Sequence, residues 1–517
     1  MSGASSSSAI TCQFGPAQSA DVDLLVLPWF EGEGPSAFDG LDRAASGEIS
    51  RALNAREFTG RPYELFVTPL IDRAWKPRRV ALIGAGQEAG FSPGFARRLG
   101  TAAALAGRAR HVGRLGFFIR PGQAAPSGDV DVAGFVQSIA EGLTLGEFTG
   151  ATYQTSAQTA GDPPAFVVVI PDLSDTSPES PARLEGGAAR GRVLGESSNL
   201  ARGLANEPAN TLTPREFSER ASRIALDGGA SVEVLDEKQI AALGMGMLLG
   251  VARGSSEPPR LMVFRHDPPG VTSGPLLALV GKGITFDTGG ISIKPAEGME
   301  KMKDDMAGGA AVACAMRAIA RLNAPIRVIG VVPATENMPG GRALKPGDIL
   351  RSAEGKTVEV INTDAEGRLV LGDALWYARQ QGATHLVDVA TLTGGMVVAL
   401  GKSTSGVFGT PDWWVDLVRR TGDRAGDRMW RMPLFDDYRD QLKSEIADMM
   451  NTGGRPASSI TAATFLKEFT GGLPWAHIDI AGTAWADEST PYMPKGPTGV
   501  AVRTLIELAL SSDTWKR

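Results

Sequence analysis

Short apolar runs alternate with longer amphipathic segments through most of the chain, and this alternation limits the folds available to it. In its first third, five runs have the length and composition of strands: Leu24 to Leu27, Leu65 to Val67, Val80 to Ile83, Gly116 to Ile119 and Phe166 to Ile170. Amphipathic stretches such as Pro93 to Ala106 and Val132 to Leu145 lie between several of them. This order predicts an α/β fold, with a parallel or mixed sheet flanked by helices.

The same alternation continues to the C-terminus. The predicted strands there are Val232 to Leu235, Leu261 to Phe264, Leu276 to Val280, Arg327 to Val332, Thr357 to Ile361, His385 to Val389 and Trp475 to Ile480. The predicted helices are Ala188 to Leu204, a helix that starts at Thr213 and Pro214, Ala307 to Leu322, Gly372 to Gln381, Trp413 to Thr421 and Ile460 to Phe469. A mostly parallel sheet with helices on both faces is the expected architecture.

The chain has 517 residues, and a single hydrophobic core stops growing at about 250 to 300 residues. Ser174 to Pro181 is rich in Ser, Pro and acidic side chains, which is the composition of a linker. We therefore predict two domains, an N-terminal α/β domain at residues 1–180 and a C-terminal α/β domain at residues 181–517.

The composition excludes several classes of protein. The net charge of −6 argues against a nucleic-acid-binding surface, which needs clustered basic side chains. The two cysteines, Cys12 and Cys314, are too few and too far apart for a disulfide framework or a Cys-based zinc site, as expected for a protein of the reducing cytoplasm. Met1 to Ile10 lacks the pattern of a secretory signal, and no run of about 18 apolar residues predicts a membrane span.

Carboxylates and a guanidinium follow the predicted strand at Thr357 to Ile361. If the backbone stays extended there, Asp364 and Glu366 point to the same side about 7 Å apart, and Arg368 joins them. This spacing suits divalent cations, although a salt-bridged surface turn has the same pattern. None of the four histidines has H-x-x-x-H spacing, so a metal site must rest on oxygen or unusual ligands.

A second charged stretch follows the apolar run Leu276 to Val280. Lys282, Asp287 and Lys294 lie in the Gly-rich segment after this run, and open α/β sheets place their sites at the carboxyl ends of parallel strands. A Gly-rich turn with solvated lysines is the alternative interpretation. Further on, Asp304 and Asp305 precede a predicted helix, where a carboxylate often acts only as an N-cap.

Taken together, Asp287, Asp305, Asp364 and Glu366 supply enough carboxylates for two metal ions about 3.5 to 4 Å apart. Such a pair of ions lowers the pKa of water from about 15.7 towards roughly 7. Lysines among these acids balance their charge, and a buried lysine with a depressed pKa can even act as a neutral ligand.

Asn362-Thr363-Asp364-Ala365-Glu366-Gly367-Arg368-Leu369 matches the signature of the leucine aminopeptidase family, also called cytosol aminopeptidases. Other stretches resemble the family in the same order along the chain: Asn206 to Pro214, Gly281 to Lys294, Met302 to Ala311, Pro346 to Asp348, Asp388 to Gly394, Ala447 to Phe469 and Tyr492 to Arg503. They cover nearly all of residues 188–510, so the C-terminal domain is expected to be the catalytic one.

The resemblance implies a two-metal exopeptidase that releases N-terminal, preferentially leucine-like residues. It implies the metal ligands Lys282, Asp287, Asp305, Asp364 and Glu366, with Asp287 and Glu366 bridging both ions, Lys282 and Asp305 serving one and Asp364 the other. Lys294 matches the residue that polarises the scissile carbonyl. Arg368 matches the residue that holds a bicarbonate ion, which shuttles the water proton.

The resemblance also implies how substrate is bound. The residues implied around the substrate are Met302, Asn362, Thr391, Leu392, Gly394, Ala481 and Ala484, with Leu392 acting through its backbone; ordinary core packing is the alternative for Met302. The free amine of the peptide binds one metal and must be neutral, so mildly alkaline pH is expected to favour activity, because the pKa of an α-amino group is about 8. The implied ions are manganese, zinc or magnesium, and the implied assembly is a homohexamer in the cytoplasm.

Three other functions remain open at this stage. A two-metal hydrolase that acts on a different N-terminal linkage, such as that of a dipeptide, would have the same ligands and a different pocket. Some relatives have acquired DNA-binding or regulatory roles, although the acidic composition argues against one here. A metal-bound scaffold without turnover is the third possibility, and the complete set of predicted site residues argues against it.

Overall fold

The computed structural model describes residues 10–120, 131–155, 162–171 and 180–515. Its contacts divide the chain into two compact units, Met1–Asn199 with Glu488–Pro494, and Leu200–Asp487 with Lys495–Arg517. The predicted linker at Ser174 to Pro181 lies mostly outside the described residues, so the division into domains at residues 180 and 181 stays a prediction. Both units are α/β structures, which confirms the predicted fold class.

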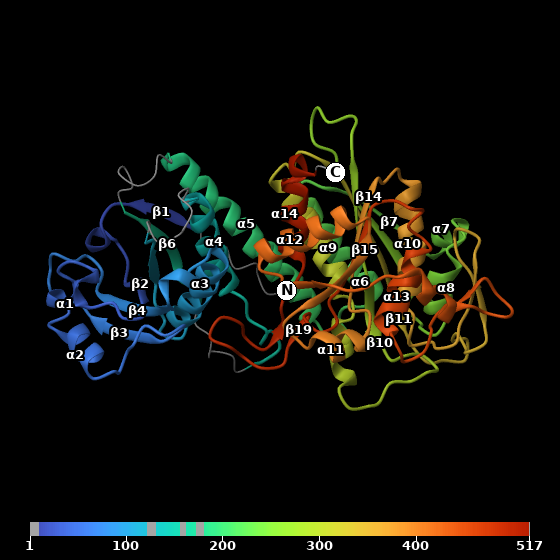
Figure 1. Cartoon of the computed structure of the whole chain (residues 1–517), viewed down its shortest axis with the longest axis horizontal. Helices are drawn as coiled ribbons and strands as arrows, with labels where there is room; N and C mark the ends of the chain where they lie inside the picture. The colour runs from blue at the N-terminus through green and yellow to red at the C-terminus, as the bar shows by residue number, and fades with distance from the viewer. Residues whose placement is uncertain (1–9, 121–130, 156–161, 172–179, 516–517) are drawn as a thin grey trace. The chain divides into compact units, whose positions relative to one another are not determined.

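The first unit contains a six-stranded sheet in the order β1-β6-β5-β2-β4-β3 (Figure 1). Its strands are β1 (Thr11–Phe14), β2 (Leu24–Phe30), β3 (Leu65–Pro69), β4 (Arg79–Gly86), β5 (Arg114–Phe118) and β6 (Ala165–Ile170). All neighbouring strands are parallel except β3, which runs antiparallel to β4 at one edge. The five predicted strands are confirmed, and the short edge strand β1 is an addition.

Helices cover both faces of this sheet. They are α1 (Leu41–Ala44), α2 (Glu48–Asn54), α3 (Pro93–Arg108), α4 (Val132–Leu145) and the long α5 (Pro181–Asn206), with short 3-10 turns η1 (Ala17–Ser19), η2 (Pro35–Ala37) and η3 (Glu88–Gly90). Every residue of β2 is buried: Leu24 and Val26 face the core under α3 and α4, whereas Leu25 and Leu27 face the core under α1 and α2. Successive side chains of a strand point to opposite faces of the sheet. Since both faces are covered here, the sequence of β2 is an unbroken apolar run.

The second unit is built on a nine-stranded sheet in the order β16-β15-β18-β14-β9-β11-β8-β7, with β10 paired to β11. Its strands are β7 (Ser231–Leu235), β8 (Arg260–His266), β9 (Leu276–Gly281), β10 (Gly283–Asp287), β11 (Arg327–Asn337), β14 (His385–Ala390), β15 (Ser405–Thr410), β16 (Met429–Arg431) and β18 (Trp475–Asp479). The central strands β18, β14, β9 and β11 are parallel, and antiparallel pairs lie outside them. The predicted, mostly parallel sheet is confirmed.

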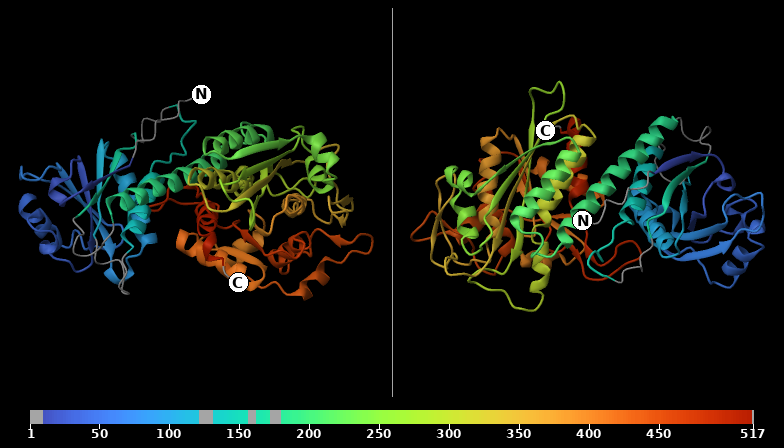
Figure 2. Two further views of the ribbon diagram at one scale, coloured as in Figure 1. Left: turned by 90° about the horizontal axis from the view of Figure 1, so that it is seen from above. Right: turned by 180° about the vertical axis from the view of Figure 1, so that it is seen from behind.

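Helices lie on both faces of this second sheet as well (Figure 2). They are α6 (Pro214–Asp227), α7 (Glu237–Ala242), α8 (Gly246–Ala252), α9 (Ala307–Arg321), α10 (Gly367–Gln380), α11 (Gly394–Leu400), α12 (Asp412–Ala425), α13 (Ser458–Lys467) and α14 (Val502–Leu510), with η4 (Met299–Asp304), η5 (Asp436–Leu442) and η6 (Ser512–Thr514). On one face α9 packs against α6, α14 and the sheet, and on the other face α10 packs against α8, α13 and the sheet.

The predicted strand Thr357 to Ile361 is wrong in length and in place. The observed strand β13 (Thr357–Glu359) ends two residues earlier and belongs to a small separate sheet with β12 (Ile349–Arg351) and β17 (Met449–Met450). Another small sheet pairs β19 (Trp485–Ala486) with β20 (Gly496–Pro497). The extended backbone expected beyond Ile361 is also wrong, because the Asn362 side chain accepts a hydrogen bond from the Asp364 amide at 2.9 Å and turns the chain.

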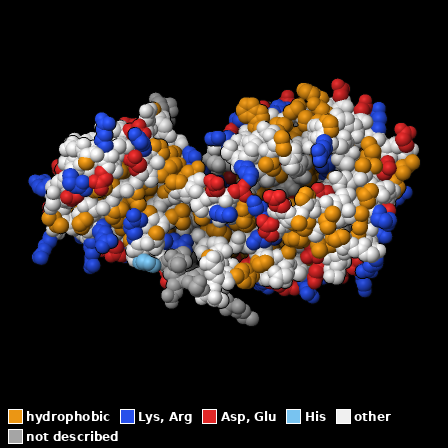
Figure 3. Space-filling model, turned by 90° about the horizontal axis from the view of Figure 1, so that it is seen from below, with side chains coloured by type: hydrophobic (Ala, Val, Ile, Leu, Met, Phe, Trp, Pro, Cys, Tyr) orange, Lys and Arg blue, Asp and Glu red, His pale blue; other side chains and the backbone are white. Residues whose placement is uncertain are grey.

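Acidic and basic side chains are interspersed over the face of the molecule drawn in Figure 3, as expected for a modest net charge of −6. No helix in the described part of the chain has the length and apolar character needed to cross a bilayer.

Candidate active site

A cavity of about 1340 Å³ lies in the second unit, lined by residues that follow β9, β10, β14 and β18. Of the predicted site residues, it brings together Lys282, Asp287, Lys294, Met302, Asp305, Asn362, Asp364, Glu366, Arg368, Thr391, Leu392, Gly394 and Ala481. Ala484 is buried and does not line the cavity. The position agrees with the rule that open α/β sheets bind ligands beyond the carboxyl ends of their strands.

Three carboxylates converge at the base of this cavity. Asp287, Asp364 and Glu366 each offer an oxygen atom, and these atoms lie within 4.8 Å of one another. Asp287 ends β10, whereas Asp364 and Glu366 come from the turn before α10, with Glu366 as the N-cap residue of that helix. Segments about 80 residues apart in the sequence thus supply one acidic cluster.

Two lysines are enclosed in the same cluster. The Lys282 ammonium lies 2.8 Å from Asp305 Oδ2 and 2.9 Å from Glu366 Oε1, and the Lys294 ammonium lies 2.8 Å from Asp287 Oδ2. Lys294 also pairs with Asp364. Only 3% of the Lys282 side chain is exposed, so the alternative of solvated lysines on a turn is wrong for this residue.

Local backbone contacts explain why Lys282 points into the site. It lies between β9 and β10, where its amide donates to the Val389 carbonyl at 3.0 Å and its carbonyl accepts from the Gly309 amide at 2.7 Å. Gly367 leaves room for its side chain, because a Cβ atom at that position would lie 2.8 Å from Lys282 Nζ. The glycine after Glu366 thus allows the close approach of the lysine, which a larger residue would displace.

Asp305 reaches the cluster from the end of η4. Neither Asp304 nor Asp305 caps α9, because the N-cap residue of that helix is Met306 and no side-chain hydrogen bond caps it. Asp305 instead accepts from Lys282 and, at 2.6 Å, from the Thr391 hydroxyl. The N-cap interpretation of these two aspartates is therefore wrong.

The buried cluster has a distinctive electrostatic balance. Burial, with the negative charge of Asp287, raises the pKa of Asp364 and Glu366 above their ordinary values. Burial lowers the pKa of Lys282, but the opposite effect of Asp305 and Glu366 is larger, and the pKa ends above its ordinary value. Two lysines thus pair with four acidic side chains, Asp287, Asp305, Asp364 and Glu366, and hold them together.

Arg368 lies in the first turn of α10 and is buried. Its Nη1 atom donates to the Asn451 carbonyl at 3.0 Å. Burial lowers its pKa to about 10, although Glu366 and Asp479 oppose this effect. The guanidinium remains charged at neutral pH and lines the cavity beside the acidic cluster.

Two asparagines of the site were missed by sequence reasoning. Asn337, at the end of β11, donates to Asp287 Oδ1 at 2.8 Å and to the Thr363 carbonyl at 3.0 Å. Asn451 accepts from the Ile361 amide at 2.8 Å and donates to the Asn362 carbonyl at 2.7 Å. Asn337 lies beyond the predicted strand Arg327 to Val332, and Asn451 lies in the stretch Ala447 to Phe469 that resembles the family, but no charge or spacing singled out either residue.

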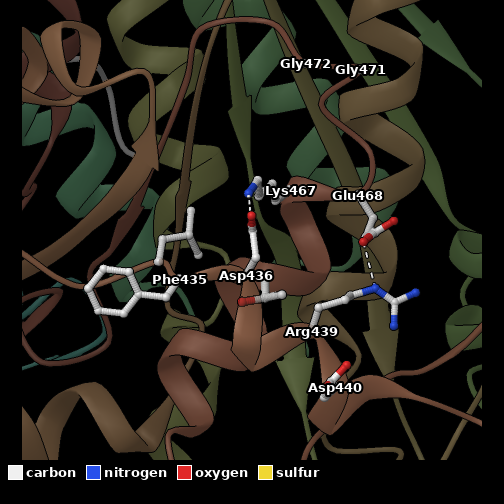
Figure 4. A pocket seen from close by; sticks show the side chains of 10 residues that line it. Phe435, Asp436, Arg439, Asp440, Lys467, Glu468, Gly471 and Gly472 are labelled. Carbon is white, nitrogen blue, oxygen red and sulfur yellow. Dashed lines mark hydrogen bonds and ion pairs between the residues drawn. The ribbon is translucent and has the colours of Figure 1, made fainter.

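A second, smaller hollow of about 470 Å³ lies between η5 and α13 (Figure 4). Four of its charged side chains pair with each other: Lys467 Nζ lies 2.8 Å from Asp436 Oδ1, and Arg439 Nε lies 2.7 Å from Glu468 Oε1. The fifth, Asp440, pairs with Lys443 at 2.7 Å. It contains none of the predicted site residues, so the larger cavity is the candidate active site.

Comparison with known proteins matches both parts of the chain to one family. The model of the "Cytosol aminopeptidase family, catalytic domain" matches residues 199–506, and that of the family's N-terminal domain matches residues 26–157. The chain belongs to the cytosol aminopeptidase family. The resemblance found in the signature around Asp364 and Glu366 is thereby confirmed, and the larger cavity lies within the catalytic domain of the family.

Relatives in this family match over nearly their full length. The probable cytosol aminopeptidase of Solibacter usitatus is 48% identical over 98% of this chain and 99% of its own, and that of Alkaliphilus metalliredigens is 43% identical over 95% and 97%. Among solved structures, a bottromycin maturation enzyme in complex with Mn has a TM-score of 0.82 at 35% identity, covering 95% of this chain and 99% of that one.

A mutant of tomato leucine aminopeptidase is similar as well, with a TM-score of 0.85 at 33% identity and coverage of 97% of this chain and 96% of that one. The similarities cover both units of the chain. The protein is accordingly a metal-dependent aminopeptidase, a hydrolase of the cytosol aminopeptidase family.

Proposed function

We propose that the protein releases N-terminal, preferentially leucine-like residues from peptides by attack of a water activated by two metal ions. The observation that carries this proposal is the convergence of Asp287, Asp364 and Glu366 within 4.8 Å, beside Lys282 and Asp305. Carboxylates are hard oxygen donors that suit manganese, magnesium and zinc. This set of donor atoms therefore fits the divalent metal ions on which the family depends.

In this proposal, Asp287 and Glu366 bridge the two ions, Lys282 and Asp305 serve one ion, and Asp364 serves the other. The central position of Glu366, next to Lys282 and hydrogen bonded by Asn337 at 3.4 Å, supports a bridging role. Lys282 has to release its proton before its nitrogen can act as a ligand. When bound, the ions would supply a nucleophilic hydroxide at neutral pH, by lowering the pKa of water to about 7.

Lys294 is assigned to the scissile carbonyl. Its ammonium is only partly exposed and is held in place by Asp287 at 2.8 Å, so it is a fixed positive charge at the wall of the cavity. A fixed cation stabilises the negative charge that develops on the carbonyl oxygen in the transition state.

Arg368 is assigned to a bicarbonate ion that accepts the proton of the attacking water. Its guanidinium is charged and buried, it lines the cavity, and it lies within the electrostatic influence of Glu366. A planar guanidinium can donate two parallel hydrogen bonds to a pair of oxygen atoms, and this geometry suits a planar bicarbonate ion. The described residues that line the cavity include no histidine, which leaves the role of the base to such an ion.

The first residue of the peptide is proposed to lie among Met302, Asn362, Thr391, Leu392, Gly394, Ala481 and Ala484. Met302 is half-buried and lines the cavity, which favours a binding role over core packing alone. Ala484 is buried and is the one member of this set that does not line the cavity. A pocket of small and apolar side chains selects leucine-like residues by fit, since each methylene changes kcat/KM about 10- to 200-fold.

The remaining parts of the proposal concern the cofactor, the assembly and the compartment. Manganese is the first ion to test, because a similar solved protein is a complex with Mn. A homohexamer predicts a mass in solution of six times 54.2 kDa, which light scattering measures directly. The names of the relatives support a cytoplasmic location.

Hydrolysis of leucine p-nitroanilide at mildly alkaline pH tests the function. The protein is stripped with a chelator, given manganese, zinc or magnesium, and compared on the free-amine substrate and its N-acetylated analogue. Turnover of the free-amine substrate alone, restored by metal, is the expected result. No turnover with any ion would favour a dipeptidase of narrow specificity or a binding role.

A further inference from the structure

We propose that Asp479 is a positioning residue, which fixes the two backbone segments that form the wall of the substrate pocket. These segments are 391–394, which follows β14, and 480–482, which follows β18. The inference rests on the proposed function of the cavity, because it concerns how that pocket selects the first side chain of the peptide.

The carboxylate of Asp479 joins the two segments directly. Its Oδ1 atom accepts hydrogen bonds from the Leu392 amide at 3.3 Å and the Ala481 amide at 3.1 Å, and its Oδ2 atom accepts from the Thr393 hydroxyl at 2.7 Å. Asp479 is the last residue of β18 and is 1% exposed. A buried anion thus connects both segments to the end of a central strand.

Thr393 extends this connection into two helices. A hydroxyl has one proton to donate and two lone pairs to accept with. Because the proton of Thr393 goes to Asp479, the lone pairs remain for the Ser459 hydroxyl at 2.6 Å, on α13, and for the Met396 amide at 3.3 Å, in the first turn of α11. Thr393 is also the N-cap residue of α11, so the carboxylate sets where that helix begins.

An asparagine cannot make all three contacts of Asp479 as an acceptor. An asparagine offers one acceptor oxygen and places an NH₂ donor where the second oxygen was. It can still accept from the two amides, but it faces the Thr393 hydroxyl with a donor. Thr393 can then keep this contact only by accepting from the amide of the asparagine and turning its own proton to Ser459. Of these two side chains, the carboxylate alone accepts from Leu392, Thr393 and Ala481 together.

The position of this wall matters because the pocket selects its substrate by fit. Leu392 and Ala481 line the cavity, and Asp479 does not. A misplacement of about 1 Å at a binding wall can reduce a rate about 100-fold. Loss of the Asp479 contacts should therefore reduce selectivity between side chains, rather than remove the metal centre.

Asp373 provides a matched control. It is also a fully buried carboxylate that accepts three backbone hydrogen bonds, from the Met247 and Leu248 amides at 3.0 Å and the Ala353 amide at 2.8 Å. It lies in α10 and does not line the cavity. Substitutions of Asp373 therefore report the general effect of removing a buried carboxylate.

The experiment compares Asp479→Asn and Asp479→Ala with Asp373→Asn and Asp373→Ala in the full chain loaded with manganese. The kcat and KM values for the p-nitroanilides of leucine, alanine and phenylalanine are measured together with metal content. We expect Asp479→Asn to lower the leucine-to-alanine ratio of kcat/KM at least threefold at unchanged metal content. The Asp373 variants should keep the wild-type ratio within twofold, even where they unfold at lower temperature.

Hydrogen exchange gives a second readout that does not depend on activity. Peptides that span 391–396 and 480–486 should exchange faster in the Asp479 variants, whereas the Asp373 variants should change only peptides near 246–252 and 350–356. If Asp479→Ala does not fold, Asp479→Asn alone decides the test.

The outcomes separate this inference from the proposed function. An active wild type with the same selectivity ratio in the Asp479 and Asp373 variants would overturn the positioning role. A wild type that is inactive with every ion would reject the proposed function instead. In that case, unchanged exchange of 391–396 and 480–486 in the Asp479 variants would also overturn the claim that Asp479 fixes these segments, and faster exchange would support it.

Discussion

Single residues in the cluster have separable effects on charge and chemistry. Glu366 is fully buried and lies 2.9 Å from the Lys282 ammonium. Its replacement by Gln keeps the shape and removes the charge that a bridging ligand needs. We expect Glu366→Gln, like Glu366→Ala, to lower kcat by at least about 10²- to 10³-fold, the range found when one group that stabilises the transition state is removed.

Circular dichroism and thermal unfolding of the same Glu366 variants are the control, since the fold should remain largely intact. Turnover at the wild-type rate in either variant would show that Glu366 is not a bridging ligand.

Arg368 should be less sensitive than Glu366. Its replacement by Ala removes the guanidinium, but a bicarbonate ion can still bind weakly to the positive charges that remain. We expect a partial loss of kcat in Arg368→Ala, smaller than that in Glu366→Gln, and a partial recovery when bicarbonate is added. The rate is measured in carbonate-free buffer and again with increasing bicarbonate. An unchanged rate in both conditions would remove the proposed role of Arg368.

Metal affinity should depend on pH through Lys282. The surrounding carboxylates raise the pKa of Lys282, so the metal-free protein keeps this proton throughout the neutral range. A metal that takes the nitrogen as a ligand must displace the proton, and its affinity therefore rises with pH, by up to about tenfold per unit for one proton released. Metal titrations at pH 6.5, 7.5 and 8.5 measure this slope, and an affinity independent of pH would show that Lys282 is not a ligand.

At the scale of elements, the site depends on how closely α9 packs on the sheet. A Cβ atom at Gly308, in the first turn of α9, would lie 2.1 Å from the Val389 carbonyl oxygen at the end of β14. We expect Gly308→Ala to lower the free energy of unfolding by about 1–3 kcal/mol, as overpacking does elsewhere.

Gly203→Ala in α5 is the matched control for Gly308→Ala. Among the described residues, apart from the backbone of the helix itself, no atom lies within 4 Å of a Cβ at position 203. Alanine favours a helix by about 0.8–1 kcal/mol over glycine. Denaturant unfolding of both variants checks the pair, and equal stability of the two would show that α9 is not closely packed on β14.

The elements were predictable where burial produces a clear pattern. The strand Leu276 to Val280 was recognisable because both faces are buried, which leaves an unbroken apolar run. Short edge strands such as β1 bury little and give no such pattern, and β10 was hidden because it begins only two residues after β9 ends. The strand at Val358 was assigned to the large sheet of the second unit, whereas it pairs with β12 and β17 in a small sheet. An alternating pattern does not reveal which sheet a strand joins.

The site was predictable only in part, because a sequence pattern reveals neighbours along the chain and not contacts between distant segments. Its charged residues lie in short motifs, so the carboxylates and lysines could be found from the sequence and the family signature. Asn337, Asn451 and Asp479 act through contacts between segments far apart in the chain, such as the 87-residue separation of Leu392 and Asp479. Such contacts exist only once the sheet has formed.

At the scale of the whole molecule, the chain combines an N-terminal α/β unit with a catalytic unit that contains all the described residues of the candidate site. The central claim is that this site binds two metal ions and that both are needed for turnover. The sharpest test is a manganese titration of the chelator-treated protein, in which bound metal per chain and hydrolysis of leucine p-nitroanilide are measured on the same samples. We expect two ions to bind per chain, with little turnover before the second binds. Full turnover in metal-free protein, or with a single ion, would contradict the two-metal site.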